Sequence, residues 1–579
     1  MSVQFSLAAL ADRPAKSASA RSAAAFLLAV GLSALLLFHF HDRFWWAPDE
    51  GAYAHVADRI LRGEVLNRDI QDIHFGHINF ANALALWLFG NNLVSLRYPL
   101  LGLGVLQACL VFFLFNGRGL GHAAVAAVSL TSLSFVQFLN PTAHWYCLFL
   151  FVAIIAALSW IGPEHRWRLC VIGFLVGTLI LFRQLTGAFV AIGVAAYLMC
   201  EAGPSNRDRS QWLPRSVLTG MALLLGAYLA TKTDLWGIVG FGIWPLLALA
   251  LAWHRISIGN LATVRLLAGL TFGAAIAAAP LIAYHMAHGS LGTWFDDTVL
   301  AAFQLTSLTF MEWAGFTNMA LLAVFQIGTA QDPAIFLNGW FWIALLALPM
   351  LTGAAAIGWT WRSEALHPLP FLAPFYALVS VHYQIPIYLF YGVGISLVAL
   401  LWLSAGSHAW HRALPPVGAC AIVIVAIYFH AGQPLTRGLV GTVAGTRIAL
   451  VPAVGVERAN LQFAPSELST YRQLISLIDR ETAPEDAILA IPVNPELYYL
   501  TGRRNPFRFF NTALGLTDDE AMRNALAVLE AEPPKLVIHR PEDKYMTPRA
   551  DTVMDFVRLY YDLIGRIDGF DVYRIAAPK

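Results

Sequence analysis

Residues 23–40 read Ala-Ala-Ala-Phe-Leu-Leu-Ala-Val-Gly-Leu-Ser-Ala-Leu-Leu-Leu-Phe-His-Phe, a run without acid, lysine or arginine. A helix needs about 20 apolar residues to cross the hydrocarbon core of a bilayer. The run is longer than the apolar core of a signal peptide, and no convincing small-residue cleavage site follows it. We therefore expect a retained first membrane span after a polar N-terminal segment, residues 1–21.

The chain repeats this pattern as far as about residue 431. Of its 579 residues, 58% are hydrophobic and 13% are charged, and the mean hydropathy is +0.61. A soluble protein carries about 25% charged residues, so lipid must cover much of this surface. The sequence predicts a membrane domain over residues 22–431. Its thirteen predicted spans are 22–41, 93–115, 122–139, 143–161, 169–182, 185–200, 216–232, 236–253, 266–285, 336–358, 367–381, 385–406 and 413–431.

The stretch 169–200 is divided by Arg183 and Gln184. An arginine in the middle of a bilayer is costly, so we expect two short helices whose tip lies outside. This choice gives a consistent positive-inside pattern. The loops on the inner side then hold Arg118, Arg166, Arg168, Arg207, Arg209, Arg215, Arg255, Arg265, Arg362 and Arg412. The N-terminus is then cytoplasmic, and an odd number of spans places the C-terminus outside.

Outside loops are predicted at residues 42–78 and 286–334, and the second is expected to hold helices that lie on the membrane. A linker, 432–456, leads to a C-terminal domain, 457–579. In this domain, helical patterns at 466–481, 518–531 and 552–564 accompany strand patterns at 487–493, 535–539 and 571–575. The predicted fold is an all-α polytopic membrane domain followed by an extracytoplasmic α/β domain. The α/β domain has no catalytic triad, P-loop or metal pattern, and we expect it to cover the site or position the acceptor.

The first outside loop holds Trp45-Trp-Ala-Pro-Asp-Glu-Gly-Ala-Tyr-Ala-His-Val-Ala-Asp-Arg-Ile-Leu-Arg-Gly63. Its apolar residues recur at helical spacing and predict a short helix for the membrane surface. They are Tyr53, Val56, Ala57, Ile60 and Leu61. Asp49 lies at the start of this helix, where free backbone N–H groups and the helix dipole keep a carboxylate ionised. The alternative is that Asp49 only caps the helix.

The same loop is rich in groups that can bind or transfer protons. They are Asp42, His55, Asp58, Arg68, Asp69, Asp72, His74 and His77. A zinc site made by His74, His77 and a carboxylate is an alternative, but two histidines without a fixed third ligand are weak evidence. The five cysteines lie in apolar stretches without metal-binding spacing. We assign no metal ligands and leave a divalent metal ion open as a cofactor.

Several short motifs follow one another along the chain. They are Pro48-Asp-Glu-Gly-Ala-Tyr53, Gly63-Glu-Val-Leu-Asn-Arg-Asp-Ile70, Leu88-Phe-Gly90, Ser95-Leu-Arg-Tyr-Pro99, His382-Tyr-Gln-Ile-Pro386 and Leu497-Tyr-Tyr-Leu-Thr-Gly-Arg503. In this order they resemble the motifs of bacterial GT-C glycosyltransferases. That family includes the protein O-mannosyltransferases and the aminoarabinose and Rgt-type lipopolysaccharide glycosyltransferases. Asn67, the stretch 72–77 and His382 depart from the family pattern, which often has Tyr, a Pro-containing stretch and Arg there.

The resemblance implies an inner-membrane enzyme with a periplasmic C-terminal domain. Such an enzyme moves a monosaccharide from a polyprenyl-phosphate donor to a hydroxyl of a glycolipid, lipopolysaccharide or protein, with inversion. It implies Asp49 as the base, with Glu50 as the alternative. The candidates for the donor phosphate are Arg183, Gln184, Arg68 and His382, and those for the sugar or acceptor are Tyr53, Asp69, Asp72 and His74. A net charge of +1 gives no indication of a nucleic-acid partner.

Two other functions share this membrane layout. A polysaccharide polymerase or ligase is expected to pair arginine and histidine in a long outer loop, whereas here an acidic motif follows the first span. A flippase or transporter of a lipid-linked sugar is expected to show internal repeats and charges inside several spans. We find no repeat, and most acids of the membrane part lie in the outside loops. These patterns favour the monosaccharide transferase.

Overall fold

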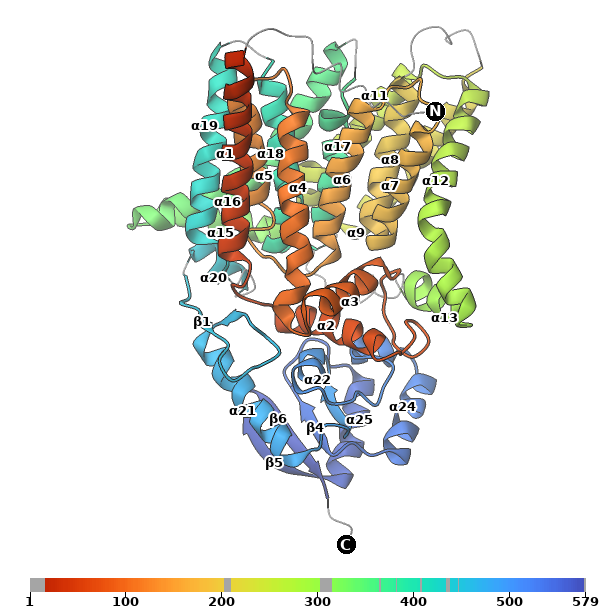
Figure 1. Cartoon of the computed structure of the whole chain (residues 1–579), viewed down its shortest axis with the longest axis vertical. Coiled ribbons are helices and arrows are strands. Elements are labelled where there is room, and N and C mark those ends of the chain that lie inside the picture. The colour runs from red at the N-terminus through yellow and green to blue at the C-terminus, as the bar shows by residue number, and fades with distance from the viewer. Residues whose placement is uncertain are drawn as a thin grey trace.

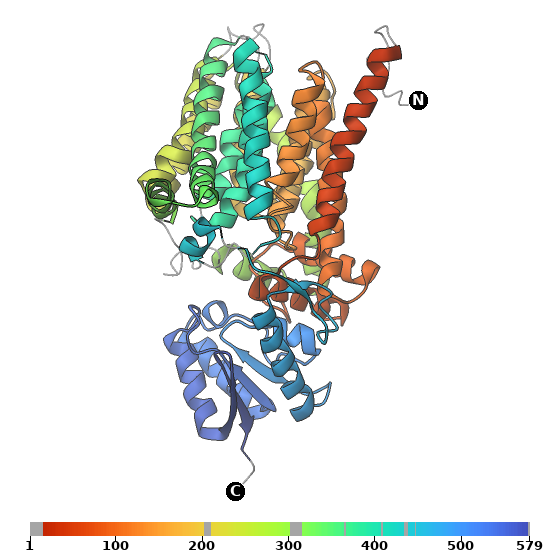
Figure 2. The same ribbon diagram turned by 90° about the vertical axis from the view of Figure 1, so that its left-hand side faces the viewer.

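The computed structural model describes residues 16–201, 210–301, 315–363, 366–381, 383–406, 409–433, 438–445 and 447–576. Its long helices form a bundle, and a C-terminal α/β domain lies against one end of that bundle (Figure 1). The first helix, α1 (Lys16–Phe40), begins at the end far from this domain and runs toward it (Figures 1 and 2).

Each of the thirteen predicted spans coincides with a helical segment. In the described residues, 10 segments are long and apolar enough to cross a membrane, and the three other predicted spans are shorter apolar helices. The bundle helices after α1 are α4 (Tyr98–Leu114), α5 (Leu120–Ser132), α6 (Ala143–Trp160), α7 (Arg168–Phe182), α8 (Gln184–Glu201), α9 (Trp212–Lys232), α11 (Ile243–Arg255), α12 (Asn260–Ala287), α16 (Pro333–Arg362), α17 (Pro368–Ala377), α18 (Pro386–Ser404) and α19 (Ala409–Phe429). The chain is therefore a multi-pass membrane protein.

The exposed surface of the bundle is apolar. On α1, Leu28 is 71% exposed and Phe38 is 67% exposed. In contrast, most residues of α6 and of α18 are buried, which places these two helices at the centre of the bundle. A soluble protein rarely shows such apolar faces, so this distribution is the one expected of helices surrounded by lipid.

The stretch 169–200 folds as two helices. The backbone is extended at Arg183, with φ −153° and ψ 110°, and α7 and α8 pack against each other on either side of this break. Gly187 permits the close approach, because a Cβ there would lie 2.5 Å from the Cα of Ile180. Arg183 is thus at the tip of a helical hairpin, as the cost of a mid-bilayer arginine predicts.

Several short helices lie outside the bundle. They are α2 (Ala47–Leu61) and α3 (His77–Phe89), which lie between the bundle and the C-terminal domain (Figure 1), and α13 (Leu291–Phe295) and α15 (Gly315–Thr329). Helix α15 lies across the direction of the bundle helices (Figure 1) and exposes Leu321 and Phe325. Such a position is expected of a helix at the membrane surface.

The prediction that the apolar face of α2 lies on the membrane surface is wrong. Val56 and Ala57 are fully buried, and α2 packs between α3 and α22 (Pro495–Thr501) of the C-terminal domain. Gly51 allows this contact, because a Cβ at that position would lie 2.5 Å from the Cβ of Glu496. The same apolar spacing therefore serves a protein interface in place of a lipid interface.

The C-terminal domain is built on a four-stranded sheet in the order β3-β4-β6-β5. Its strands are β3 (Ile488–Ile491), β4 (Leu536–His539), β5 (Tyr561–Ile567) and β6 (Phe570–Ile575). β3 and β4 are parallel, and the two other pairs are antiparallel. Helices α21 (Pro465–Glu481) and α22 pack on one face of the sheet, whereas α24 (Asp519–Ala531) and α25 (Pro548–Tyr560) pack on the other. The segment before this sheet holds a small antiparallel pair, β1 (Val451–Pro452) and β2 (Gln462–Phe463).

The predicted helix 552–564 is wrong in its second part. The helix ends at Tyr560, and residues 561–567 form β5, which pairs with β6. A turn at Asp568 and Gly569, both with positive φ, joins the two strands. Pairing with β6 outweighs the apolar spacing that suggested a longer helix.

Candidate active site

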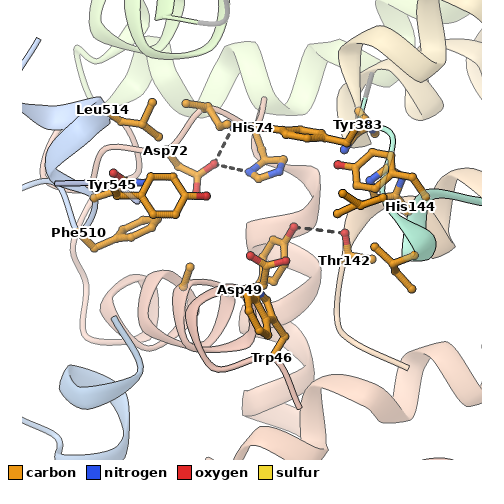
Figure 3. Close-up of a pocket in the computed structure, with 18 of the residues that line it drawn as sticks. Trp46, Asp49, Asp72, His74, Thr142, His144, Tyr383, Phe510, Leu514 and Tyr545 are labelled. Carbon is orange, nitrogen blue, oxygen red and sulfur yellow. Dashed lines mark hydrogen bonds and ion pairs between the residues drawn. The ribbon is translucent and has the colours of Figure 1, made fainter. Parts of the chain in front are cut away.

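A cavity of about 350 Å³ lies where the bundle helices, at their ends nearest the C-terminal domain, meet residues 42–78, the predicted first outside loop, and the C-terminal domain itself. Its walls come from three parts of the chain, each far from the others in sequence. The lining residues include Asp49, Tyr53, Gln71, Asp72 and His74 from the loop, Thr142, His144, Arg183, Tyr383, Ile385, Ile387, Tyr388 and Tyr391 from the bundle, and Phe509, Phe510, Asn511, Leu514, Lys544 and Tyr545 from the C-terminal domain. Figure 3 shows Asp49 and His74 between the walls formed by the other two parts.

Asp49 lies in the first turn of α2 and lines the cavity. The capping position belongs to Trp46, and no hydrogen bond of the Asp49 carboxylate occurs within the described part of the chain. Asp49 is an exposed residue because it faces the open cavity, and the walls of that cavity surround it with protein. These walls desolvate the carboxylate and raise the pKa of Asp49 to about 6, although Lys544 and His74 act in the opposite direction. A carboxylate with such a pKa is ionised at neutral pH and is a stronger base than an exposed aspartate.

Glu50 is directed away from the cavity. Its carboxylate accepts hydrogen bonds from Arg97, with Nη2 at 2.7 Å and 2.9 Å and Nε at 3.2 Å. Both side chains are fully buried, and Arg97 also donates to the backbone oxygens of Arg43 and Phe44. The structure therefore places Glu50 in an ion pair that holds the start of α2 against the bundle.

Tyr53, Asp72 and His74 face the same cavity as Asp49. The Nδ1 atom of His74 lies 2.7 Å from Oδ1 of Asp72, and this oxygen also accepts from the backbone N–H of His74. The Tyr53 hydroxyl lies 3.3 Å from Oγ1 of Thr142 (Figure 3). The Asp72 contact fixes the imidazole so that its Nε2 atom remains for a ligand or a proton.

Arg183 contributes a positive charge to the bundle side of the cavity. Its guanidinium lies 5.7 Å from the centre of the Tyr388 ring, and its Nε is buried without a hydrogen-bond partner. Within the described residues no carboxylate forms an ion pair with it. Gln184 lies beside it and donates to the backbone oxygen of Ile73, so it holds the loop against the helical tip.

Other predicted residues lie elsewhere. Arg68 and Asp69 form an exposed ion pair of 2.8 Å, and Asp69 also accepts from the backbone N–H of Val65. Neither lines the cavity. His382 lies outside the described residues. The structure thus brings together Asp49, Tyr53, Asp72, His74 and Arg183, and it separates Glu50, Arg68 and Asp69 from them.

The sequence analysis did not identify the aromatic residues that line the bundle side of the cavity, nor the residues that the C-terminal domain contributes to it. On the bundle side, His144 stacks on Tyr391 with ring centres 3.7 Å apart, and Tyr388 lies 5.2 Å from Tyr391. The spacing of Tyr388 and Tyr391 on one helix was a signal, but within a span it is also typical of ordinary packing. The loop after β4 supplies Lys544 and Tyr545, for which the sequence offers no signal.

The described residues contain no group of three or more His, Cys, Asp and Glu side chains arranged for a metal ion. His77, which the zinc alternative requires, packs against the ring of Phe182. His74 is held by Asp72. The two histidines are therefore engaged in different contacts.

Comparison with known proteins gives likenesses only at the level of structure. The sequence matches no protein family and no curated protein. The chain is similar to ArnT from Cupriavidus metallidurans, solved with undecaprenyl phosphate bound, with 14% identity and a TM-score of 0.40 over 96% of this chain and 99% of that chain. It is also similar to the oligosaccharyltransferase of Archaeoglobus fulgidus, solved with Zn and sulfate, with 13% identity and a TM-score of 0.42 over 89% of this chain and 68% of that chain.

Both solved proteins are GT-C glycosyltransferases, the class that the sequence resembles.

Proposed function

We propose that the protein is a membrane glycosyltransferase that moves a monosaccharide from a polyprenyl-phosphate donor to a hydroxyl group of an extracytoplasmic acceptor. One observation carries the proposal. Asp49, a carboxylate with a raised pKa, and Arg183, an arginine without a carboxylate partner among the described residues, line the same cavity. Transfer of a sugar from a lipid phosphate needs a base for the acceptor and a cation for the departing phosphate.

The position of the cavity suits a lipid-linked donor. Arg183 lies at the tip of two spans, so a phosphate at the membrane surface can reach it while the polyprenyl chain stays in lipid. Ile385, Ile387 and Tyr388 line the same side and offer apolar surface to the first isoprene units. An arginine can bind a phosphate through two parallel N–H groups, and Arg183 lines the cavity at this end of the two spans.

In the proposed reaction the oxygen of the acceptor hydroxyl attacks the anomeric carbon as Asp49 takes its proton. The bond between that carbon and the phosphate oxygen breaks, and its electron pair stays on the polyprenyl phosphate. Arg183 stabilises the charge that develops there. Attack opposite to the leaving phosphate inverts the anomeric configuration. Tyr53 and the Asp72–His74 pair lie close enough to contact the sugar hydroxyls.

The experiment measures transfer from radiolabelled polyprenyl-phosphate sugars to an envelope acceptor fraction by purified wild-type, Arg183→Gln and Arg183→Lys proteins. We expect transfer by the wild type, a loss of about tenfold or more in kcat/KM for Arg183→Gln, and partial activity for Arg183→Lys. A single charged hydrogen bond has about this effect. Folded wild-type protein that transfers no sugar from any donor would contradict the proposal, and lipid flipping would then be the next activity to assay.

A further inference from the structure

We propose that Lys544 forms an anion-binding subsite in the outer wall of the cavity, and that the acceptor carries a phosphate or carboxylate near the hydroxyl that receives the sugar. The inference rests on the proposed function and names the chemical class of the acceptor. It also assigns a specificity-determining residue to the C-terminal domain.

The cavity has two different walls. The bundle wall contains Arg183, and its position between two spans makes it the side for the lipid-linked donor. The opposite wall belongs to the C-terminal domain. Figure 3 shows Phe510, Leu514 and Tyr545 on one side, Thr142, His144 and Tyr383 on the other, and Asp49 between them. A base between the walls can take a proton from an acceptor on the outer wall as it attacks a sugar on the bundle wall.

The outer wall has the composition of a site for a charged sugar. Phe509, Phe510 and Tyr545 supply aromatic surface, Asn511 supplies an amide group, and Gln71 of the first loop adds a second amide group to the lining of the cavity. The Lys544 ammonium lies 5.3 Å from the centre of the Tyr545 ring, which holds it on this wall. A small number of polar groups on an apolar wall orients a ligand, and the ammonium selects for an anion.

Charge balance in the cavity supports the same assignment. Asp72 is in contact with His74, at 2.7 Å. The carboxylate of Asp49 lines the same cavity and would repel an anionic acceptor. Lys544 is close enough to lower the pKa of Asp49 by its charge, so it also offsets this repulsion. A cation on the acceptor side is needed for an anionic acceptor and not for a neutral one.

The test uses the full-length protein and three synthetic alkyl glycosides that differ only in one sugar substituent, which is a phosphate, a carboxylate or a hydroxyl. Transfer from one labelled donor is measured for wild-type, Lys544→Gln and Lys544→Arg proteins. We expect the wild type to prefer an anionic glycoside by about tenfold or more in kcat/KM. Lys544→Gln should lose this preference, and Lys544→Arg should keep most of it. The phosphate and carboxylate acceptors distinguish the two anions.

One further readout and one matched control separate this subsite from other roles. The KM of the donor should be unchanged in Lys544→Gln. Lys535→Gln is the matched control, because Lys535 is exposed in the same domain and does not line the cavity. A wild type that transfers to all three glycosides equally would refute the subsite and leave the proposed function intact. So would a Lys544→Gln variant that loses all acceptors equally or binds the donor more weakly. A wild type without any transfer would refute the proposed function itself.

Discussion

At the scale of single residues, Asp49 and Glu50 show how neighbouring carboxylates acquire different roles. Adjacent residues on a helix point about 100° apart, so only one of the two can face the cavity. Arg97 binds Glu50 in a fully buried pair, and removing one partner of such a pair costs about 3–5 kcal/mol. The sequence could identify the acidic motif but could not choose between its members, because the partner of Glu50 lies 47 positions away.

The pH dependence of transfer tests the role of Asp49. Desolvation by the cavity walls raises the pKa of Asp49 to about 6, and a base acts only in its ionised form. We therefore expect kcat/KM to be constant above this pH and to fall about tenfold per unit below it. The profile is measured with one donor and one acceptor in a detergent in which the protein stays folded. A profile that stays flat to about pH 5, or a residual Asp49→Asn activity with the same acidic fall, would show that another group titrates.

At the scale of elements, α2 and the α7–α8 hairpin position the site. The spans could be predicted from sequence because lipid makes apolar composition and length decisive. The tip at Arg183 could be predicted for the same reason. The second half of 552–564 could not, since Leu563 and Ile564 satisfy both helical and strand patterns, and pairing with β6 decides between them. The apolar face of α2 was assigned wrongly to the membrane surface, because lipid and a protein neighbour select the same apolar residues.

A substitution at Gly51 tests the contact between α2 and α22. A Cβ there would lie 2.5 Å from both the Cβ and the backbone nitrogen of Glu496, and backbone cannot move aside cheaply. We expect Gly51→Ala to destabilise this contact by about 1–3 kcal/mol. Faster proteolytic release of the C-terminal domain and a lower transfer rate should follow. Gly102→Ala in α4 is the control, because nothing lies within 4 Å of a Cβ there.

At the scale of the whole molecule, the C-terminal domain and the first outside loop form one structural unit. Trp45 and Ala54 of the loop share a hydrophobic core with Leu497 of α22 and Ile538 of β4. Arg458 lies 2.8 Å from Asp58 of α2, and Arg508 lies 2.7 Å from Asp297 of the second outside loop. These contacts bring Lys544 to the cavity. A lysine in a polar loop could not be recognised from sequence, because its role depends on how the domain docks on α2.

The most direct test of the central claim is transfer of a radiolabelled sugar from a polyprenyl phosphate by wild-type, Asp49→Asn and Asp69→Asn proteins. Asp69 belongs to the same loop but does not line the cavity, so Asp69→Asn is the matched control. We predict transfer by the wild type and the control, and a loss of about 100-fold or more in Asp49→Asn, as expected for a general base. Equal transfer by wild-type and Asp49→Asn proteins would contradict the assignment of Asp49 as the base.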